Sequence, residues 1–278
     1  MKPFLGIDLT TNKKNEQMNG LEFLVQTPSA ALSSTLEHSS EKAEKTIEKA
    51  KLPLPLRIGQ SVSGFAALII AGGILRADVS LAQGYRNAPG LYWIAGICAI
   101  LWLILWLISK QKAKAVLETD ESTQTFSHLE GTASAIYKEL SVPNDAKEID
   151  ILSFFYKIKD GEIKVHEKGM QVFQYLNPEF KIFSDEENLY LANLEGKYAF
   201  PLSSIKKLHT VKKHIRIAGW NKEEKYNKGI YKQYKLTTDN YGCIHCKQYY
   251  ILEIDHQGES CGIYIPCYEL PILEECTK

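Results

Sequence analysis

Two long apolar runs, residues 58–75 and 91–109, dominate the pattern of apolar and polar positions along the chain. The second run contains no ionisable side chain other than the thiol of Cys98. A helix rises about 1.5 Å per residue, so each run is long enough to cross a hydrocarbon core about 30 Å thick. We therefore predict a transmembrane hairpin made of two helices.

Small residues in the first run predict how these helices meet. Gly59, Ser63, Ala67 and Ala71 recur every four residues, which gives one helix face a smooth stripe that a second helix can approach closely. Two alternatives stay open. The first run can be a re-entrant or interfacial segment, and the second can be the core helix of a soluble protein.

The basic residues that flank the runs predict their orientation. Lysines and one arginine are concentrated before the first run, and three lysines follow the second, whereas residues 76–89 between the runs contain only two arginines. Basic residues favour the cytoplasmic side of a membrane. We expect a multi-pass protein of the cell membrane with both termini in the cytoplasm.

From residue 149 on, the apolar period changes from that of a helix to that of a strand. Short runs rich in Val, Ile, Tyr and Phe alternate with turn residues, which predicts an antiparallel sheet, a sandwich or a small barrel. The runs cover residues 151–158, 163–166, 171–176, 180–183, 189–192, 198–200, 208–217, 230–237, 249–254 and 262–266. A short helix over residues 268–276 should close this domain. The expected fold class is a membrane α hairpin followed by a mainly-β (α+β) cytoplasmic domain.

These patterns divide the chain into four parts. Residues 1–57 form an N-terminal cytoplasmic segment with a possible short hairpin in residues 1–25, followed by a charged helix or tether. Residues 58–109 form the hairpin of spans, and residues 110–148 a helical linker with an amphipathic helix near residues 125–140. Residues 149–278 form the β-rich domain.

Charge is balanced overall, with 33 basic and 33 acidic residues, so no general attraction to nucleic acid is expected. A local excess of basic residues lies between positions 206 and 235. If this segment is a strand, Lys212, His214 and Arg216 share one face, and this face can bind anionic lipid headgroups or a protein partner. The candidate binding residues are Lys206, Lys207, Lys212, His214 and Arg216. The alternative is a solvated edge strand whose lysines prevent sheets from pairing.

Five of the six cysteines lie in the last 36 residues, on the side expected to be reducing, so free thiols are expected. One hypothesis is a zinc site of Cys243, Cys246 and Cys267, completed by His245 or His256. A strand register with Ile254 opposite Glu259 would bring Cys246 opposite Cys267 and allow a redox-responsive pair instead. The simplest interpretation is cysteines that pack as small apolar groups, without any cofactor.

Motifs for hydrolases, nucleotide-binding loops and metalloproteases are absent from the sequence, so we expect no catalytic residues. Residues 180–208 resemble the strand–strand passage of bacterial pleckstrin-homology-like domains, which often follow membrane hairpins. The resemblance implies a small curved barrel with a C-terminal helix and a binding role. The expected function is a membrane-anchored, non-catalytic binding or scaffolding protein. The alternatives are a thiol- or zinc-dependent sensor and an unrecognised membrane enzyme.

Overall fold

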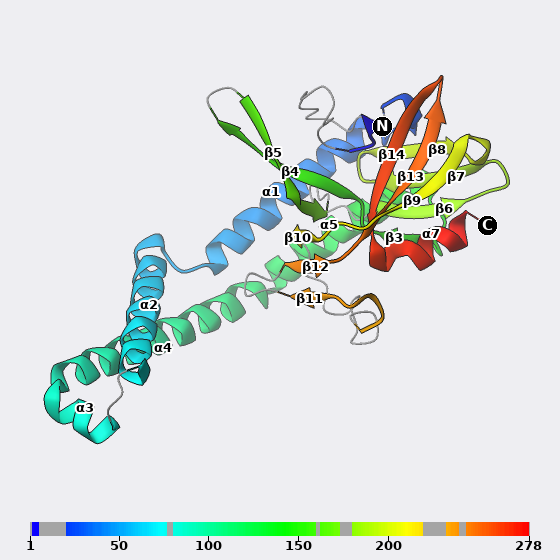
Figure 1. Cartoon of the computed structure of the whole chain (residues 1–278). Helices are drawn as coiled ribbons and strands as arrows, with labels where there is room; N and C mark the ends of the chain where they lie inside the picture. Colours follow the sequence, from blue (N-terminus) through cyan, green and yellow to red (C-terminus); the bar gives the residue numbers. More distant parts are fainter. Residues whose placement is uncertain are drawn as a thin grey trace. The chain divides into compact units, whose positions relative to one another are not determined.

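The computed structural model describes residues 2–5, 21–76, 80–159, 162–172, 180–218, 232–238 and 243–277 (Figure 1). The chain divides into two compact units. Unit 1 contains residues 1–33 and 133–278, and unit 2 contains residues 34–132. The helical unit is thus inserted into the sequence of the β-rich unit.

Five helices account for nearly all of unit 2, and the first and last of them begin or end in unit 1. They are α1 (Ala30–Ala50), α2 (Leu54–Arg76), α3 (Leu81–Asn87), α4 (Pro89–Leu117) and α5 (Asp120–Glu139). The Ser80 hydroxyl accepts a hydrogen bond from the Gln83 backbone N–H and so caps α3 between the two long apolar helices.

Helices α2 and α4 pack side by side through small residues (Figure 1). Ser63 on α2 and Leu105 on α4 are buried, and Gly59 lies against Leu105. A Cβ atom on Gly64 would come within 2.8 Å of the Trp102 ring, so the close approach depends on glycine. The first half of the predicted small-residue stripe therefore faces α4, whereas Ala71 is exposed.

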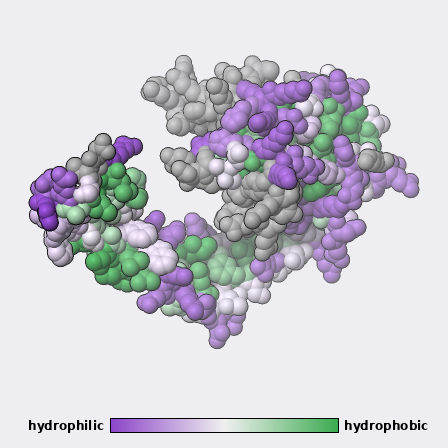
Figure 2. Space-filling view, turned by 60° about the horizontal axis from the view of Figure 1, so that its bottom comes forward, coloured by the Kyte–Doolittle hydropathy of each residue, from purple (hydrophilic) through white to green (hydrophobic). Residues whose placement is uncertain are grey.

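Many other apolar side chains of α2 and α4 are exposed, and Figure 2 shows apolar surface over the helical unit on the face in view. Leu68, Ile69 and Leu75 on α2 are 69–78% exposed, and Ile97 and Ile100 on α4 are 60–61% exposed. Both helices are long and apolar enough to cross a membrane, with only 6% of the most apolar window of each buried. The predicted pair of apolar helices is thus present.

The described residues of unit 1 form three sheets. In the first, the order is β2-β8-β7-β6-β3, and all neighbours are antiparallel. In the second, the order is β1-β14-β13-β9, with only the short β1–β14 pair parallel. In the third, the order is β11-β12-β10-β5-β4, with only β10–β5 parallel.

The strand bounds follow the predicted runs closely in most places. They are β1 (Lys2–Pro3), β2 (Leu24–Gln26), β3 (Lys147–Ile149), β4 (Leu152–Lys159), β5 (Glu162–Val172), β6 (Phe180–Ser184), β7 (Asn188–Asn193), β8 (Gly196–Pro201), β9 (Ile205–Val211), β10 (Ile215–Ala218), β11 (Thr237–Thr238), β12 (Ile244–Cys246), β13 (Tyr249–His256) and β14 (Glu259–Pro266). Helix α7 (Leu270–Cys276) follows, as predicted. The α+β class, with largely antiparallel sheets and a C-terminal helix, is confirmed.

The described parts of the N-terminal segment join two sheets, since β1 pairs with β14 and β2 pairs with β8, whereas most of the possible hairpin lies outside the described residues. Two predictions of local structure need correction. The predicted strand over 208–217 is two strands in different sheets. Residues 232–234 form a helical turn instead of a strand. The predicted positions 6–20, 173–176 and 230–231 lie outside the described residues.

An aromatic cluster in the core of unit 1 joins the N-terminal segment to the strands. The Phe4 ring lies 5.3 Å from the rings of Tyr198 and Phe200 and 6.3 Å from that of Phe180, in edge-to-face geometry. Phe4, Phe180 and Phe200 are at most 1% exposed. Edge-to-face aromatic pairs add about 0.5–1.5 kcal/mol each to the gain from burial.

A tight turn joins β7 to β8 and fixes the position of β2. The Asn193 side-chain oxygen accepts hydrogen bonds from the backbone N–H groups of Glu195 and Gly196. A Cβ atom on Gly196 would lie 2.6 Å from a methyl carbon of Leu24 and 2.9 Å from the Gln26 carbonyl oxygen. Only glycine therefore allows β2 to pair with β8 at this distance.

Gly196→Ala should lower the free energy of unfolding by about 1–3 kcal/mol, because its methyl group overpacks the β2–β8 contact. Gly131→Ala is the matched control, since nothing lies within 4 Å of its Cβ position in α5. The control should stabilise the protein by up to about 1 kcal/mol through helix propensity. Denaturant unfolding of the full-length protein in detergent, followed by circular dichroism, measures both. An unchanged midpoint for Gly196→Ala would contradict the β2–β8 contact.

Candidate functional site

The basic residues predicted to share a strand face do so on β10 and the segment before it. Ile215 and Ile217 are fully buried in the core, whereas Lys212 and His214 are exposed and Arg216 is half-buried. This alternation places the three cationic or titratable side chains away from the core. We call Lys212, His214, Arg216 and His245 the β10–β12 basic face, because β12 contributes its fourth member.

His245 is the residue of this face that sequence reasoning assigned elsewhere, as a possible zinc ligand. Strands β10 and β12 are antiparallel, with Arg216 opposite His245. His245 Nδ1 lies 3.2 Å from His214 Nε2, a hydrogen bond in which one ring donates and the other accepts. The alternation of apolar and polar residues on β12 could have predicted this position of His245. Ile244 and Cys246 are buried, and His245 between them is not.

The other two predicted basic residues lie in a different sheet. Lys206 and Lys207 are on β9, an edge strand of the β1-β14-β13-β9 sheet. Lys206 Nζ forms an ion pair of 3.0 Å with Asp255, and Lys207 is opposite Glu253 on β13. The interpretation as edge-strand lysines fits these two residues, whereas β10 is a central strand. The five predicted basic residues are thus divided between two sheets, with Lys206 and Lys207 on β9 and the other three on or just before β10.

Carboxylates beside β9 are held in their charged form. His209 Nε2 lies 2.5 Å from Glu253 Oε2, and this hydrogen bond, followed by one from Ser260, lowers the pKa of Glu253. The hydrogen bond and charge of Lys206 lower the pKa of Asp255. The positive charge of β9 is therefore largely matched by carboxylates of β13.

The cysteines come together only in part. Cys246 on β12 and Cys267, directly after β14, are buried, and their thiols are hydrogen-bonded to each other. This hydrogen bond, together with burial, raises the pKa of the Cys246 thiol. All six cysteines are free thiols. The predicted contact between Cys246 and Cys267 is thus present.

The strand register from which this contact was predicted is wrong. Ile254 is opposite Cys261 instead of Glu259, a shift of two positions in the β13–β14 register. Cys246 belongs to β12, which pairs with β10 and β11, and reaches Cys267 across the core. Within the described ranges, no group of three or more His, Cys, Asp or Glu side chains is placed to hold a metal ion. The zinc hypothesis for Cys243, Cys246 and Cys267 stays untested.

Two buried carboxyl groups escaped sequence reasoning. Asp150 and Glu269 are 2% and 1% exposed. A Glu269 carboxyl oxygen accepts a hydrogen bond from the Asp150 backbone N–H, and the Tyr268 hydroxyl donates to the Asp150 carboxyl group. These bonds connect the segment before β4 to the start of α7. In the sequence both residues look like ordinary surface acids, because their burial arises from contacts over more than 100 positions.

The depressed pKa values of Glu253 and Asp255 predict acid sensitivity. A lowered pKa in the folded state stabilises the protein fully above the ordinary pKa values of 4.5 and 3.8, and this contribution is lost as pH falls through the folded values. Glu253→Gln should reduce the loss of unfolding free energy between pH 6 and pH 3. Glu259→Gln, which removes an exposed carboxylate from the same hairpin, should keep the parent slope. Equal slopes for both variants would contradict the role of the His209–Glu253 bond.

Burial of the thiol pair predicts slow chemical modification. Native full-length protein treated with an alkylating reagent should be labelled at half-buried Cys276 before Cys246 and Cys267, because an alkylating reagent must reach a solvent-exposed thiolate. In denaturant all cysteines should react. Mass spectrometry of the digested protein assigns each modified position. Rapid labelling of Cys246 in the native protein would contradict the packing described above.

Comparison with known proteins identifies no relative of this chain. No family model, no curated protein and no solved structure matches the chain. The resemblance of residues 180–208 to pleckstrin-homology-like domains is therefore not tested by a match. Functional assignment for this chain depends on the two apolar helices, the β10–β12 basic face and the buried thiol pair.

Proposed function

We propose that this chain is a membrane-anchored, non-catalytic binding protein, in which α2 and α4 span the bilayer and unit 1 is the binding domain on the cytoplasmic side. The observation that carries the proposal is the outward-facing apolar surface of α2 and α4. Leu68, Ile69 and Leu75 would each leave most of their side chain in water if the protein were soluble. Burying such side chains is favourable by about 1.5–3 kcal/mol each.

The architecture of unit 1 supports a binding role for it. A pleckstrin-homology-like domain requires antiparallel strands on one core and a C-terminal helix, and β6 to β9, β13, β14 and α7 contribute to a single core. Fold alone does not define activity. The β10–β12 basic face, in which Lys212 and His214 are exposed, is the surface of unit 1 that we assign to anionic headgroups or to an acidic protein partner.

A thiol-dependent sensor on the same anchor is the second candidate. The specific observation in its favour is the hydrogen bond between Cys246 and Cys267 in the core. Both thiols are at most 1% exposed, so a sensor would require local opening of unit 1 before an oxidant could reach them. Binding without catalysis needs no such step, and we favour it for this reason.

Thiol labelling of membrane vesicles tests the anchor and its orientation. Gln83→Cys introduces a thiol into α3, between the proposed spans, and Glu118→Cys introduces one after α4. A membrane-impermeant maleimide should label Gln83→Cys in right-side-out vesicles and Glu118→Cys only in inside-out vesicles. Labelling of both positions from one side would refute the spans. Recovery of the protein in the aqueous fraction without detergent would refute the anchor itself.

A further inference from the structure

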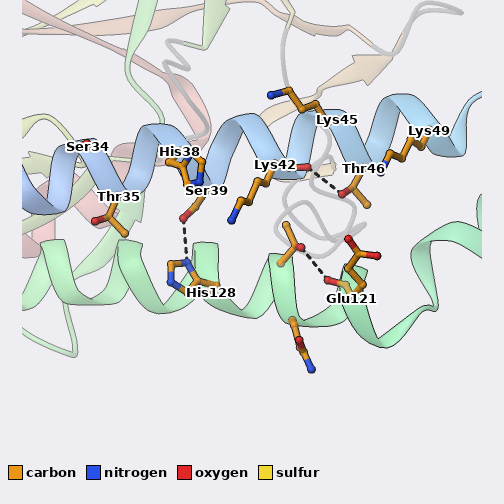
Figure 3. A pocket seen from close by; sticks show the side chains of 12 residues that line it. Ser34, Thr35, His38, Ser39, Lys42, Lys45, Thr46, Lys49, Glu121 and His128 are labelled. Carbon is orange, nitrogen blue, oxygen red and sulfur yellow. Dashed lines mark hydrogen bonds between the residues drawn. The ribbon is translucent and has the colours of Figure 1, made fainter.

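A polar cavity of 730 Å³ lies between α1 and α5, within unit 2 (Figure 3). All 12 residues that line it are polar or charged. Its volume is in the range of about 300–1,000 Å³ that small-molecule sites occupy, but such sites are usually lined by apolar side chains. The polar and charged groups that line this cavity therefore suit a hydrophilic ligand.

A part-buried hydrogen bond connects the two helices at this cavity. The Ser39 hydroxyl on α1 lies 3.0 Å from His128 Nδ1 on α5, and Ser39 is 4% exposed. Thr46 and Thr125 donate their hydroxyl hydrogens to carbonyl oxygens one turn earlier in their own helices. Their oxygens can still accept hydrogen bonds, whereas donors for an anion must come from other side chains.

Three lysines on α1 supply the charge. Lys42, Lys45 and Lys49 line the cavity, and Glu121 is its only carboxylate. Lys45 forms an ion pair of 3.6 Å with Glu41 on its own helix. Within the part of the chain that the structure describes, Lys42 and Lys49 have no ion-pair partner within 4.0 Å. Figure 3 shows Lys42 extending from α1 toward α5, so its ammonium group is placed to contact a ligand between the helices.

One end of the cavity lies next to the proposed spans. Lys49 is in the last turn of α1, shortly before α2, and Glu121 is in the first turn of α5, shortly after α4. Lys112 Nζ on α4 donates a hydrogen bond of 2.6 Å to the carbonyl oxygen of Lys51, which connects the two span ends. If α2 and α4 are inserted, this end of the cavity is at headgroup depth.

We propose that the α1–α5 cavity binds the phosphate group of an anionic, hydrophilic ligand, with Lys42 and Lys49 as its principal contacts. Ammonium groups form strong charge-assisted hydrogen bonds with phosphate oxygens. The phosphate can belong to a lipid headgroup or to a soluble phosphate ester. The lipid source rests on the proposed membrane anchor, whereas the soluble source does not.

Binding measurements on full-length protein in detergent test this site. The soluble probe is glycerol 3-phosphate, titrated by calorimetry. The lipid probes are dioleoyl phosphatidic acid and, as its uncharged comparison, dioleoyl phosphatidylcholine, both measured by native mass spectrometry. Lys42→Gln and Lys49→Gln remove the proposed contacts. Lys114→Gln removes the same charge from the exposed end of α4, outside the cavity, and circular dichroism verifies that each variant is folded.

Each cavity variant should weaken binding of the phosphate probe about tenfold or more, because a hydrogen bond to a charged group contributes about 1.5–3 kcal/mol. The Lys114→Gln control should change it less than twofold. This pattern with glycerol 3-phosphate supports a soluble ligand, and the same pattern with phosphatidic acid alone supports a lipid headgroup.

Two outcomes would overturn the inference: neither probe binds, or Lys114→Gln weakens binding as much as the cavity variants do. The vesicle labelling described above tests the anchor separately. An inserted protein that binds neither phosphate probe would lose this site and keep its anchor. A water-soluble protein that binds glycerol 3-phosphate at Lys42 would keep the site and lose the anchor.

Discussion

The contact between α2 and α4 is narrow, and this constrains the rest of the molecule. The two helices cover each other along a stripe around Ser63 and Leu105, and their other apolar side chains face outward. Soluble monomers rarely expose contiguous apolar patches larger than a few hundred Å². A bilayer removes the free-energy cost of exposing these apolar side chains to water, because lipid surrounds them while each helix satisfies its own backbone hydrogen bonds. The anchor that we propose therefore follows from solvation, without any appeal to a relative.

Unit 1 depends on contacts between segments that unit 2 separates in the sequence. Phe4 packs on Phe180, Tyr198 and Phe200, and Phe23 packs on Phe200. The strands that carry these partners follow both apolar helices in the chain, so the core of unit 1 cannot be completed until the helical unit has been made. Two helices, α1 and α5, connect the units in sequence, and each continues across a unit boundary.

Local patterns predicted the apolar helices, α7 and most strands, because each depends on neighbouring residues alone. The sequence could not reveal partners that depend on distant segments. Lys2–Pro3 carries almost no pattern and pairs with β14 because the edge of that sheet is available. The β13–β14 register was missed because Gln257 and Gly258 form a two-residue turn with positive φ, which pairs His256 with Glu259. Once that turn is known, Ile254 must be opposite Cys261.

The basic residues show why counting charge along a sequence gives an incomplete view of a binding surface. Lys206 is matched by Asp255, a residue nearly 50 positions away that only the β9–β13 pairing brings close. Arg216 and His214 acquire His245 from another strand, which places a third basic side chain on the same face. Lys42 and Lys49 belong to a helix with four glutamates and three lysines, yet both line one cavity, whereas Lys45 forms an ion pair with Glu41 on its own helix. Available charge, and with it the capacity to bind an anion, is therefore decided by the partners that folding supplies to each lysine.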